Sequence, residues 1–372
     1  MKGGFFLDQT WQRLASEESP FVIWDGFGLE GNSGISRHGL CLFDSLSKIQ
    51  RPPIILRDGA EGFFPQRLAR SKFFWPRHVE AILKSKERSF LRGKTIFHGL
   101  SNFNVPRSRA FHRDFKLVLT VHDLIPLLAP KLVSKSSSVQ LYYCLKKLSP
   151  SLDRVVCVSH WTESVLIDFF PELKDRTIVI PNGFPRFKAS GVTCDTSHTR
   201  ILSVSRYEKY KNFELLVKIA RALSPGSILT LITNSEGLRY ASRFGKDLMD
   251  KKKLIVRTAV PESELKDHYQ SSNVYLQTSL FEGFCLPLAE ALSHGVSCVY
   301  LEGSGMDEVA GKSIAFALPR NSGLDDWVDA IGSARERSLS EGSSRSIETY
   351  LSNKPSWDDA ARSLSQLYAK LL

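Results

Sequence analysis

Short apolar runs alternate with amphipathic segments along almost the whole chain. In the first half, runs typical of buried strands lie at 21–25, 53–56, 95–99, 116–123, 154–159 and 177–183. Segments with helical spacing lie at 39–49 and 160–170, and Ser159 is suited to cap the second of these helices. Short apolar strands that alternate with helices predict a parallel sheet covered on both faces.

The pattern then restarts after a polar stretch without periodicity at 190–199, which we interpret as a linker around 191–199. The second half predicts helices at 211–223 and 262–272 and strands at 200–205, 227–233, 254–257, 273–278, 296–301 and 314–318. The expected fold is therefore α/β, with two doubly wound parallel-sheet domains. Ligands of such sheets bind at the carboxyl ends of the strands, so the loops to search follow Asp25, Asp123, Asn182, Ser205 and Thr278.

Composition excludes several classes of protein. The 372 residues are 42% hydrophobic and 24% charged, which argues against global disorder and is enough for two domains. We find no apolar run near the roughly 20 residues that span a bilayer and no signal peptide. The six cysteines show no CxxC pair and no metal-ligand spacing with the histidines, which suits a reducing cytoplasm.

The positive charge lies in the first half of the chain. Residues 1–190 hold 28 Lys and Arg against 17 Asp and Glu, whereas residues 191–372 hold 22 of each. Segment 63–94 has nine Lys or Arg, two Glu and several aromatic residues, and Arg70, Lys72 and Trp75 are its candidate contacts. This mixture favours an anionic membrane surface or a lipid-pyrophosphate acceptor over nucleic acid. The alternative is that the aromatic residues are core and the lysines face water.

Two loops are candidates for binding phosphate. Arg206 and Lys211 follow a strand and lead into a helix N-terminus, where two cations and the helix dipole suit a diphosphate. The glycine-containing loop at 30–39 includes Gly34 and allows backbone amides to approach an anion. The alternatives are a solvated basic turn and a glycine turn without a ligand. The second loop is not GxGxxG, which disfavours a dinucleotide-dependent dehydrogenase.

Glu282 and Glu290 lie on either side of a Gly-Phe-Cys-Leu-Pro segment. Pro287 suits the first position of a helix that ends near Gly295, so we expect Glu290 in its first turn and Glu282 in the preceding loop. The pair could hydrolyse a glycosidic bond, hold a metal, bind sugar hydroxyls or face water. Hydrolysis is disfavoured because no apolar pocket is evident that would keep one carboxyl protonated, and a metal because the chain has no Asp-x-Asp pair.

The ordered set of segments resembles family 4 glycosyltransferases with the GT-B fold. The similar segments are DGFGLEGNSGISRH, TVHDLIPLLAP, VVCVSHWT, VIPNG, SVSRYEKYKN, FEGFCLPLAEAL with its E-x7-E spacing, and SWDDAARSLSQLY. This chain departs from the family at Ser205, where glycine is common, and at Ser36 and His38, where Gly and Tyr often stand. About twenty extra residues also precede the first strand.

The resemblance implies an acceptor-binding domain at 1–190, a nucleotide-sugar-binding domain at 200–355 and a terminal helix at 356–372 that returns to the first domain. Glu290 would hold the ribose, Glu282 the transferred sugar, and Arg206 and Lys211 the diphosphate. The remaining donor contacts would come from Gly34, Ser205, Val260, Gly283, Phe284, Cys285 and Leu286. His122 would approach the sugar from the facing domain, paired with Asp123 beside it. Arg37 and His98 are candidate acceptor contacts, and His38 and His160 are expected to form local hydrogen bonds.

The function implied is transfer of a hexose from a nucleotide-sugar to a glycan or lipid-linked acceptor, with retained anomeric configuration and no metal or other cofactor. Mannose from GDP-mannose is slightly favoured as the donor sugar, with rhamnose, glucose and N-acetylhexosamine as alternatives. The expected role is cell-surface polysaccharide or glycolipid synthesis at the cytoplasmic face of a membrane. A nucleotide-sugar epimerase of the same fold and a non-catalytic nucleotide-sugar or lipid-binding protein remain as alternatives. Incubation with donor and no acceptor separates the first alternative, because an epimerase releases a free sugar. The second alternative, a non-catalytic binding protein, is disfavoured because Arg206, Lys211, Glu282 and Glu290 are all present.

Overall fold

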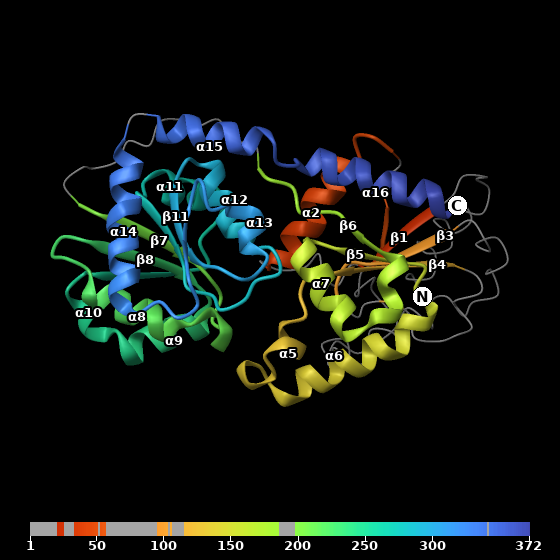
Figure 1. Cartoon of the computed structure of the whole chain (residues 1–372), viewed down its shortest axis with the longest axis horizontal. Helices are drawn as coiled ribbons and strands as arrows, with labels where there is room; N and C mark the ends of the chain where they lie inside the picture. The colour runs from red at the N-terminus through yellow and green to blue at the C-terminus, as the bar shows by residue number, and fades with distance from the viewer. Residues whose placement is uncertain are drawn as a thin grey trace, which may run out of the picture.

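The computed structural model describes residues 21–25, 33–50, 53–56, 95–102, 105, 115–185, 198–340 and 342–372. They form two parallel-sheet units side by side, with the last helix of the chain lying on the first unit (Figure 1). The predicted α/β architecture with two doubly wound sheets is therefore confirmed.

The first sheet has the strand order β2-β1-β3-β4-β5-β6 among the described residues, and all its neighbouring strands are parallel. Its strands are β1 (Phe21–Asp25), β2 (Ile54–Leu56), β3 (Thr95–Gly99), β4 (Lys116–Val121), β5 (Arg154–Cys157) and β6 (Thr177–Val179). Its helices are α2 (Gly34–Leu46), α5 (Ile125–Leu128), α6 (Lys135–Leu148) and α7 (His160–Phe169), with 3₁₀ turns η3 (Pro130–Leu132), η4 (Ser149–Ser151) and η5 (Pro171–Arg176).

Both faces of this sheet are buried, which explains its continuous apolar strands. Leu117, Leu119 and Val121 point to one face and pack with α6 and α7. Val118, between them, points to the other face, in a cluster with residues of α2 and of α16 (Trp357–Leu371). Because successive side chains of a strand alternate between faces, each face needs its own apolar set.

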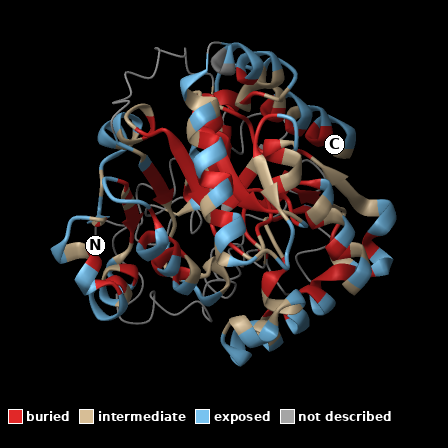
Figure 2. Cartoon of the chain, turned by 60° about the vertical axis from the view of Figure 1, so that its left-hand side comes forward, coloured by how far each residue is buried: buried red, intermediate tan, exposed pale blue. Residues whose placement is uncertain are grey.

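The second sheet has the order β12-β11-β10-β7-β8-β9 and is also parallel throughout. Its strands are β7 (Arg200–Val204), β8 (Ile228–Thr233), β9 (Leu254–Thr258), β10 (Val274–Gln277), β11 (Ser297–Leu301) and β12 (Phe316–Leu318). One face packs against α8 (Phe213–Ala222), α9 (Ser235–Phe244), α10 (Lys246–Asp250) and α14 (Leu324–Leu339). The other packs against α11 (Glu262–Gln270), α12 (Leu286–Ser293), α13 (Met306–Ala310) and α15 (Ser343–Ser352). Figure 2 shows the buried strands between helices whose outer faces are exposed.

The chain returns to the first sheet through α16. Trp24 Nε1 donates a hydrogen bond of 2.9 Å to the Tyr368 hydroxyl, and Phe184 N donates one of 2.8 Å to the carbonyl of Pro355. A Cβ added to Gly183 would lie 2.2 Å from the Trp357 nitrogen, so only glycine allows the two crossing segments to pack this closely.

The elements differ from the sequence expectations mainly at helices. Helix α2 begins at Gly34 rather than at residue 39, because the Ser33 side chain caps the Ser36 amide at 3.1 Å. The sequence assigned no helix to the segments that form α9 and α14. Most of the linker expected at 191–199 lies outside the described residues. None of the described helices is long and apolar enough to cross a membrane.

Candidate functional site

The loops singled out by their place after strands converge where the two sheets face each other. The loop after β4 carries His122, the segment after β7 leads to Lys211, and the loop after β10 carries Glu282. A Cβ added to Gly283 would lie 1.8 Å from the carbonyl oxygen of His122, so these two loops touch across the domains. Carboxyl ends of parallel strands are the expected place for a ligand.

Glu282 and Lys211 form an ion pair at this junction. Lys211 Nζ lies 2.5 Å from Glu282 Oε1, and the same oxygen accepts from Ser279 Oγ at 2.7 Å and from Gln277 Nε2 at 3.0 Å. Glu282 is buried, which excludes the solvent-facing alternative for it. Burial disfavours the charged lysine, but the adjacent carboxylate outweighs this and raises the pKa of Lys211. The lysine is therefore charged at neutral pH.

Glu290 lies in a different environment, on the buried side of α12. The helix begins at Leu286, one residue earlier than predicted, so Glu290 is in the second turn and not in the first. Its carboxylate accepts a 2.9 Å hydrogen bond from the Tyr269 hydroxyl and lies 3.1 Å from Arg37 Nε. Burial raises its pKa to about 7, with Arg37 and Tyr269 opposing that shift. The expectation that neither glutamate has surroundings that favour its protonated form is therefore wrong for Glu290, because burial raises its pKa.

Arg37 connects this glutamate to the first domain. It extends from α2, and its Nη2 also lies 2.7 Å from Glu262 Oε1 at the start of α11. Sequence reasoning placed Arg37 at the acceptor, whereas here it contacts two carboxylates of the opposite domain. No sequence pattern indicates the contacts of Arg37 with Glu262 and Glu290, because the arginine and the two glutamates belong to separate domains.

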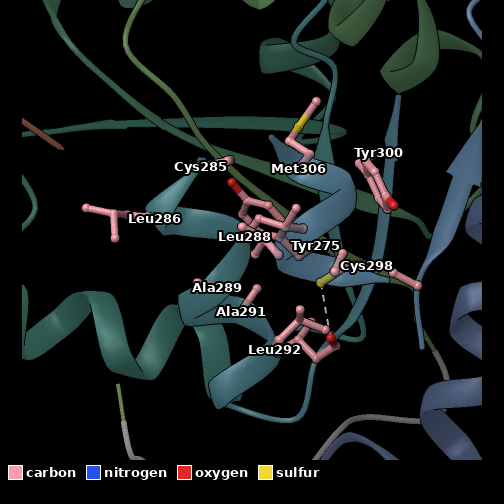
Figure 3. Close-up of a cluster of buried hydrophobic side chains, with 14 of the residues drawn as sticks. Tyr275, Cys285, Leu286, Leu288, Ala289, Ala291, Leu292, Cys298, Tyr300 and Met306 are labelled. Atoms are coloured by element: carbon pink, nitrogen blue, oxygen red, sulfur yellow. Dashed lines mark hydrogen bonds between the residues drawn. The ribbon is translucent and has the colours of Figure 1, made fainter. Parts of the chain in front are cut away.

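The loop between the glutamates has an unusual backbone conformation. Cys285 has a φ of 77°, in the left-handed region, and precedes the first residue of α12. Phe284 packs edge-on against Phe184, with 5.9 Å between ring centroids. Among the described residues, no protein acceptor receives the amide hydrogen of Gly283 or of Phe284. Behind the loop, Leu286 is buried and Leu288, Leu292 and Tyr275 hold α12 in the apolar core (Figure 3).

The loop after β7 contributes its two cations unequally. Arg206 is exposed, and no carboxylate in the described part of the chain pairs with it, whereas Lys211 is engaged by Glu282. Ser205 donates its backbone N–H to the Ile232 carbonyl at 3.0 Å. Asn212, in the left-handed conformation, caps α8 through its side chain. Val260 lies on the same side of the second sheet, after β9, and packs against the buried cluster beneath α12.

His122 has a defined tautomer. Its Nε2 lies 2.7 Å from the Leu100 carbonyl and must be the protonated nitrogen, because a carbonyl only accepts. Burial lowers its pKa to about 4, so the ring is neutral and Nδ1 is an acceptor. The expected pairing with Asp123 is wrong: the Asp123 carboxylate accepts from the Ile125 amide at 3.1 Å instead.

The other histidines have separate roles. His98 is fully buried and uses both ring nitrogens, 2.6 Å from the Tyr368 hydroxyl and 2.8 Å from Thr120 Oγ1, so its assignment as an acceptor contact is wrong. His38 forms a long-range rather than a local bond, 2.6 Å from Asn182 Oδ1, and its ring meets the His122 ring edge to face at 4.7 Å. Sequence reasoning missed this packing of His38 against His122. His160 is exposed beside Glu163, as a local partner should be.

Three expectations concern other groups. Gly34 is the first residue of α2 with open space around its α-carbon, and its anion contact stays a prediction. Arg70, Lys72 and Trp75 lie outside the described residues, as does nearly all of 63–94. Among the described residues, no cluster of three or more His, Cys, Asp or Glu side chains could hold a metal ion.

The two halves match two family models. Residues 38–186 match the model described as Glycosyltransferase Family 4, and residues 192–340 match the model described as Glycosyl transferases group 1. A phosphatidylinositol N-acetylglucosaminyltransferase chain of Arabidopsis thaliana is 23% identical over 79% of this chain. An Escherichia coli O-antigen chain mannosyltransferase B is 26% identical over 68% of it. The chain spans 64% of the plant relative's length and 68% of the bacterial one's.

Solved structures share the fold. Sucrose-phosphate synthase from Thermosynechococcus elongatus superposes with a TM-score of 0.74 at 16% identity, covering 95% of this chain and 99% of that one. Anabaena HepE in complex with UDP-glucose superposes with a TM-score of 0.71 at 14% identity, covering 94% of this chain and 100% of that one. The two family models together cover the second sheet, the first sheet except β1, and the loops that carry Lys211, Glu282 and Glu290. The chain belongs to the family 4 glycosyltransferases and has their two-domain GT-B fold.

Proposed function

We propose that this protein transfers a hexose from a nucleotide-sugar to a glycan or lipid-linked acceptor. The observation that carries the proposal is the largely buried Lys211–Glu282 ion pair, opposite the neutral His122 and beside two amides without acceptors in the described part of the chain. A cation and free amides suit a diphosphate, and carboxylates suit sugar hydroxyls. The relatives named above carry N-acetylglucosaminyl- or mannosyltransferase names, and HepE was solved with UDP-glucose.

In this proposal, each side chain has one task. Glu290 accepts hydrogen bonds from the ribose hydroxyls and Glu282 from the hydroxyls of the transferred sugar. Lys211 and Arg206 stabilise the charge that grows on the leaving diphosphate. His122 offers Nδ1 as an acceptor to a sugar hydroxyl from the opposite domain, because Nε2 is already bound to Leu100.

We also propose that the reaction retains anomeric configuration without a metal. An acceptor hydroxyl attacks the anomeric carbon on the face from which the phosphate departs. The bond from that carbon to the phosphate oxygen breaks, and the acceptor's proton passes to the same phosphate oxygen. Protein cations then serve where a metal would otherwise neutralise the diphosphate. Mannose is our preferred sugar and GDP-mannose the preferred donor, in cell-surface polysaccharide or glycolipid synthesis on a cytoplasmic membrane face.

A thermal-shift panel of nucleotide-sugars in EDTA tests the donor site. A ligand that binds only the folded state raises its stability, by about 2.7 kcal/mol at a hundredfold excess over the dissociation constant. We expect at least one nucleoside diphosphate sugar to raise the melting temperature, with GDP-mannose giving the largest shift. No shift from any nucleoside diphosphate or its sugar would contradict the donor site. A shift that appears only when divalent metal replaces EDTA would contradict metal independence.

A further inference from the structure

The outer face of α6 has a composition that the donor site does not explain. Between residues 124 and 152 the chain has four lysines and no acidic residue. This segment forms α5, η3 and α6, which lie together along one edge of the first domain, below α7 in the view of Figure 1. This segment therefore carries charge of a single sign.

Helix α6 exposes bulky apolar side chains on the same face. Tyr143 is 68% exposed, Val139 47% and Tyr142 40%, while Leu141, Cys144, Leu145 and Leu148 are buried against the sheet. Positions 142 and 143 each lie three or four residues from 139 and from 146, so Val139, Tyr142, Tyr143 and Lys146 lie in one stripe of the helix. Leu128 of α5, 38% exposed, adds to the same segment.

Lysines border the stripe. Lys135 precedes it, Lys146 and Lys147 follow it, and Lys131 lies in the turn before the helix. Lys146 pairs with Glu172 at 2.9 Å, whereas within the described residues no carboxylate pairs with Lys131, Lys135 or Lys147. A helix that lies in a membrane interface combines an apolar stripe with flanking cations, and tyrosine suits that boundary because its ring is apolar and its hydroxyl polar.

This face begins close to the candidate site. Leu128 follows His122 by six residues, and six residues span at most roughly 20 Å even when fully extended. Asp123 fixes the start of α5 by accepting from the Ile125 amide, so the segment is tied to the His122 loop. A surface held by α5 and α6 would therefore lie within reach of a lipid-linked acceptor whose head group enters beside His122.

We propose that the exposed face of α5 and α6 docks on an anionic lipid bilayer. This face comprises the apolar side chains of Leu128, Val139, Tyr142 and Tyr143 and the lysines Lys131, Lys135, Lys146 and Lys147. Its use in bringing a lipid-linked acceptor to His122 rests on the proposed function, but the docking itself does not. Charge complementarity selects an anionic lipid surface, because each lysine near such a surface adds about 1 kcal/mol, or roughly fivefold in binding.

Sedimentation with lipid vesicles tests the docking. The full chain should bind vesicles of phosphatidylcholine with phosphatidylglycerol, bind phosphatidylcholine alone at least tenfold less, and be released as salt rises. The double variant K135Q/K147Q should lose about tenfold or more in binding to the anionic vesicles. The double variant V139S/Y143S should also lose binding, because it removes the exposed apolar area; Tyr142 is left unchanged because its ring contacts Phe170.

The matched control is K246Q/K251Q, which removes two exposed lysines from the second domain. It should bind anionic vesicles like the unaltered chain. The docking proposal is overturned if the unaltered chain does not bind anionic vesicles, or if the α6 variants bind as well as the control. The thermal shift with nucleotide-sugars, measured on the same variants without vesicles, should be unchanged. A donor site that fails while vesicle binding persists would therefore contradict the proposed function and leave the docking surface standing.

Discussion

Two glutamates of one motif have opposite surroundings. Glu282 has a lysine, a serine and an amide as hydrogen-bond donors to one oxygen. Glu290 has burial as its dominant influence, with Arg37 and Tyr269 as partial compensation. Burial raises the pKa of the Glu290 carboxyl, so it takes up a proton more readily than an exposed glutamate does. The two side chains are therefore suited to different tasks, because the first lies beside the cation Lys211 and the second beside Arg37 and the Tyr269 hydroxyl.

The ion pair of Glu282 gives the first prediction. Lys211→Ala should lower turnover by two or more orders of magnitude, because it removes the cation at the proposed diphosphate position. Lys209→Ala is the matched control, since Lys209 lies in the same 3₁₀ turn and is exposed. Steady-state turnover with the donor found by thermal shift is the measurement, and far-ultraviolet circular dichroism checks the fold. Near-normal turnover of Lys211→Ala would remove this residue from the mechanism.

Glu290 gives a prediction about pH and stability. Its pKa is about 7 in the folded chain against a usual 4.5, so between these values the folded state holds more protons than the unfolded state. The free energy of unfolding should therefore fall as pH rises through that window, by about 3 kcal/mol in total from this group. Glu290→Gln cannot titrate at this position and should lack this loss. Urea unfolding of both proteins from pH 4 to pH 8 measures the difference, and parallel profiles would contradict the raised pKa.

At the scale of elements, the loop between β10 and α12 depends on a close approach of backbones. A Cβ on Gly283 would lie 1.8 Å from the His122 carbonyl oxygen, well inside any contact that real atoms make. The Gly283 carbonyl in turn accepts from Ser159 Oγ at 2.5 Å, before α7 of the first domain. The glycine thus allows both sides of the junction to meet.

Gly283→Ala should prevent this approach and hold the domains apart. We expect turnover to fall at least tenfold while each domain remains folded, because the clash lies between domains and not within one core. Gly332→Ala in α14 is the control, since a Cβ there meets nothing within 4 Å. Turnover is compared with the radius of gyration from small-angle scattering. An unchanged radius and full activity for Gly283→Ala would show that the two loops do not need this contact.

The sequence predicts elements better than it predicts this junction. Buried strands such as Thr95–Gly99 were found with their bounds, because an apolar run is a local signal. The predicted start of α12 is one residue too late. The chain turns into the helix at Cys285, whose left-handed conformation is uncommon for cysteine and has no sequence signal. His98 and His122 both lie near strand ends in the sequence. His98 differs because it contacts Tyr368, a residue far along the chain that no local pattern connects to it. Contacts such as Arg37 with Glu290 depend on how two domains pack, which no local pattern encodes.

For the whole molecule, several sets of contacts between described residues hold the domains together around the candidate site. Arg37 bridges to Glu262 and Glu290, Gly283 packs on the His122 loop, and Glu308 binds the start of α7. Each set lies beside a residue of the proposed donor site. Domain closure and donor binding should therefore be coupled, because a ligand that contacts both domains favours the arrangement in which these contacts form.

Glu308 offers the clearest test of that coupling. Its carboxylate accepts from the amides of His160 at 2.9 Å and Trp161 at 2.6 Å, the first two of α7, although it belongs to the opposite domain. A carboxylate at a helix N-terminus adds about 1 kcal/mol. Glu308→Ala should therefore lower the ratio of closed to open molecules about fivefold and raise the concentration of donor needed for half-maximal rate.

Two comparisons separate closure from folding in this variant. Glu302→Ala removes a half-buried carboxylate of the same domain that pairs only with Lys312 among the described residues, and it should leave the donor dependence unchanged. Saturating donor should restore the compact radius of gyration to Glu308→Ala, because ligand binding supplies the free energy that the carboxylate no longer contributes. If Glu308→Ala keeps the donor dependence and compactness of the unaltered chain, the bond from α13 to α7 does not control closure. The coupling must then reside in Arg37 or in the Gly283 contact.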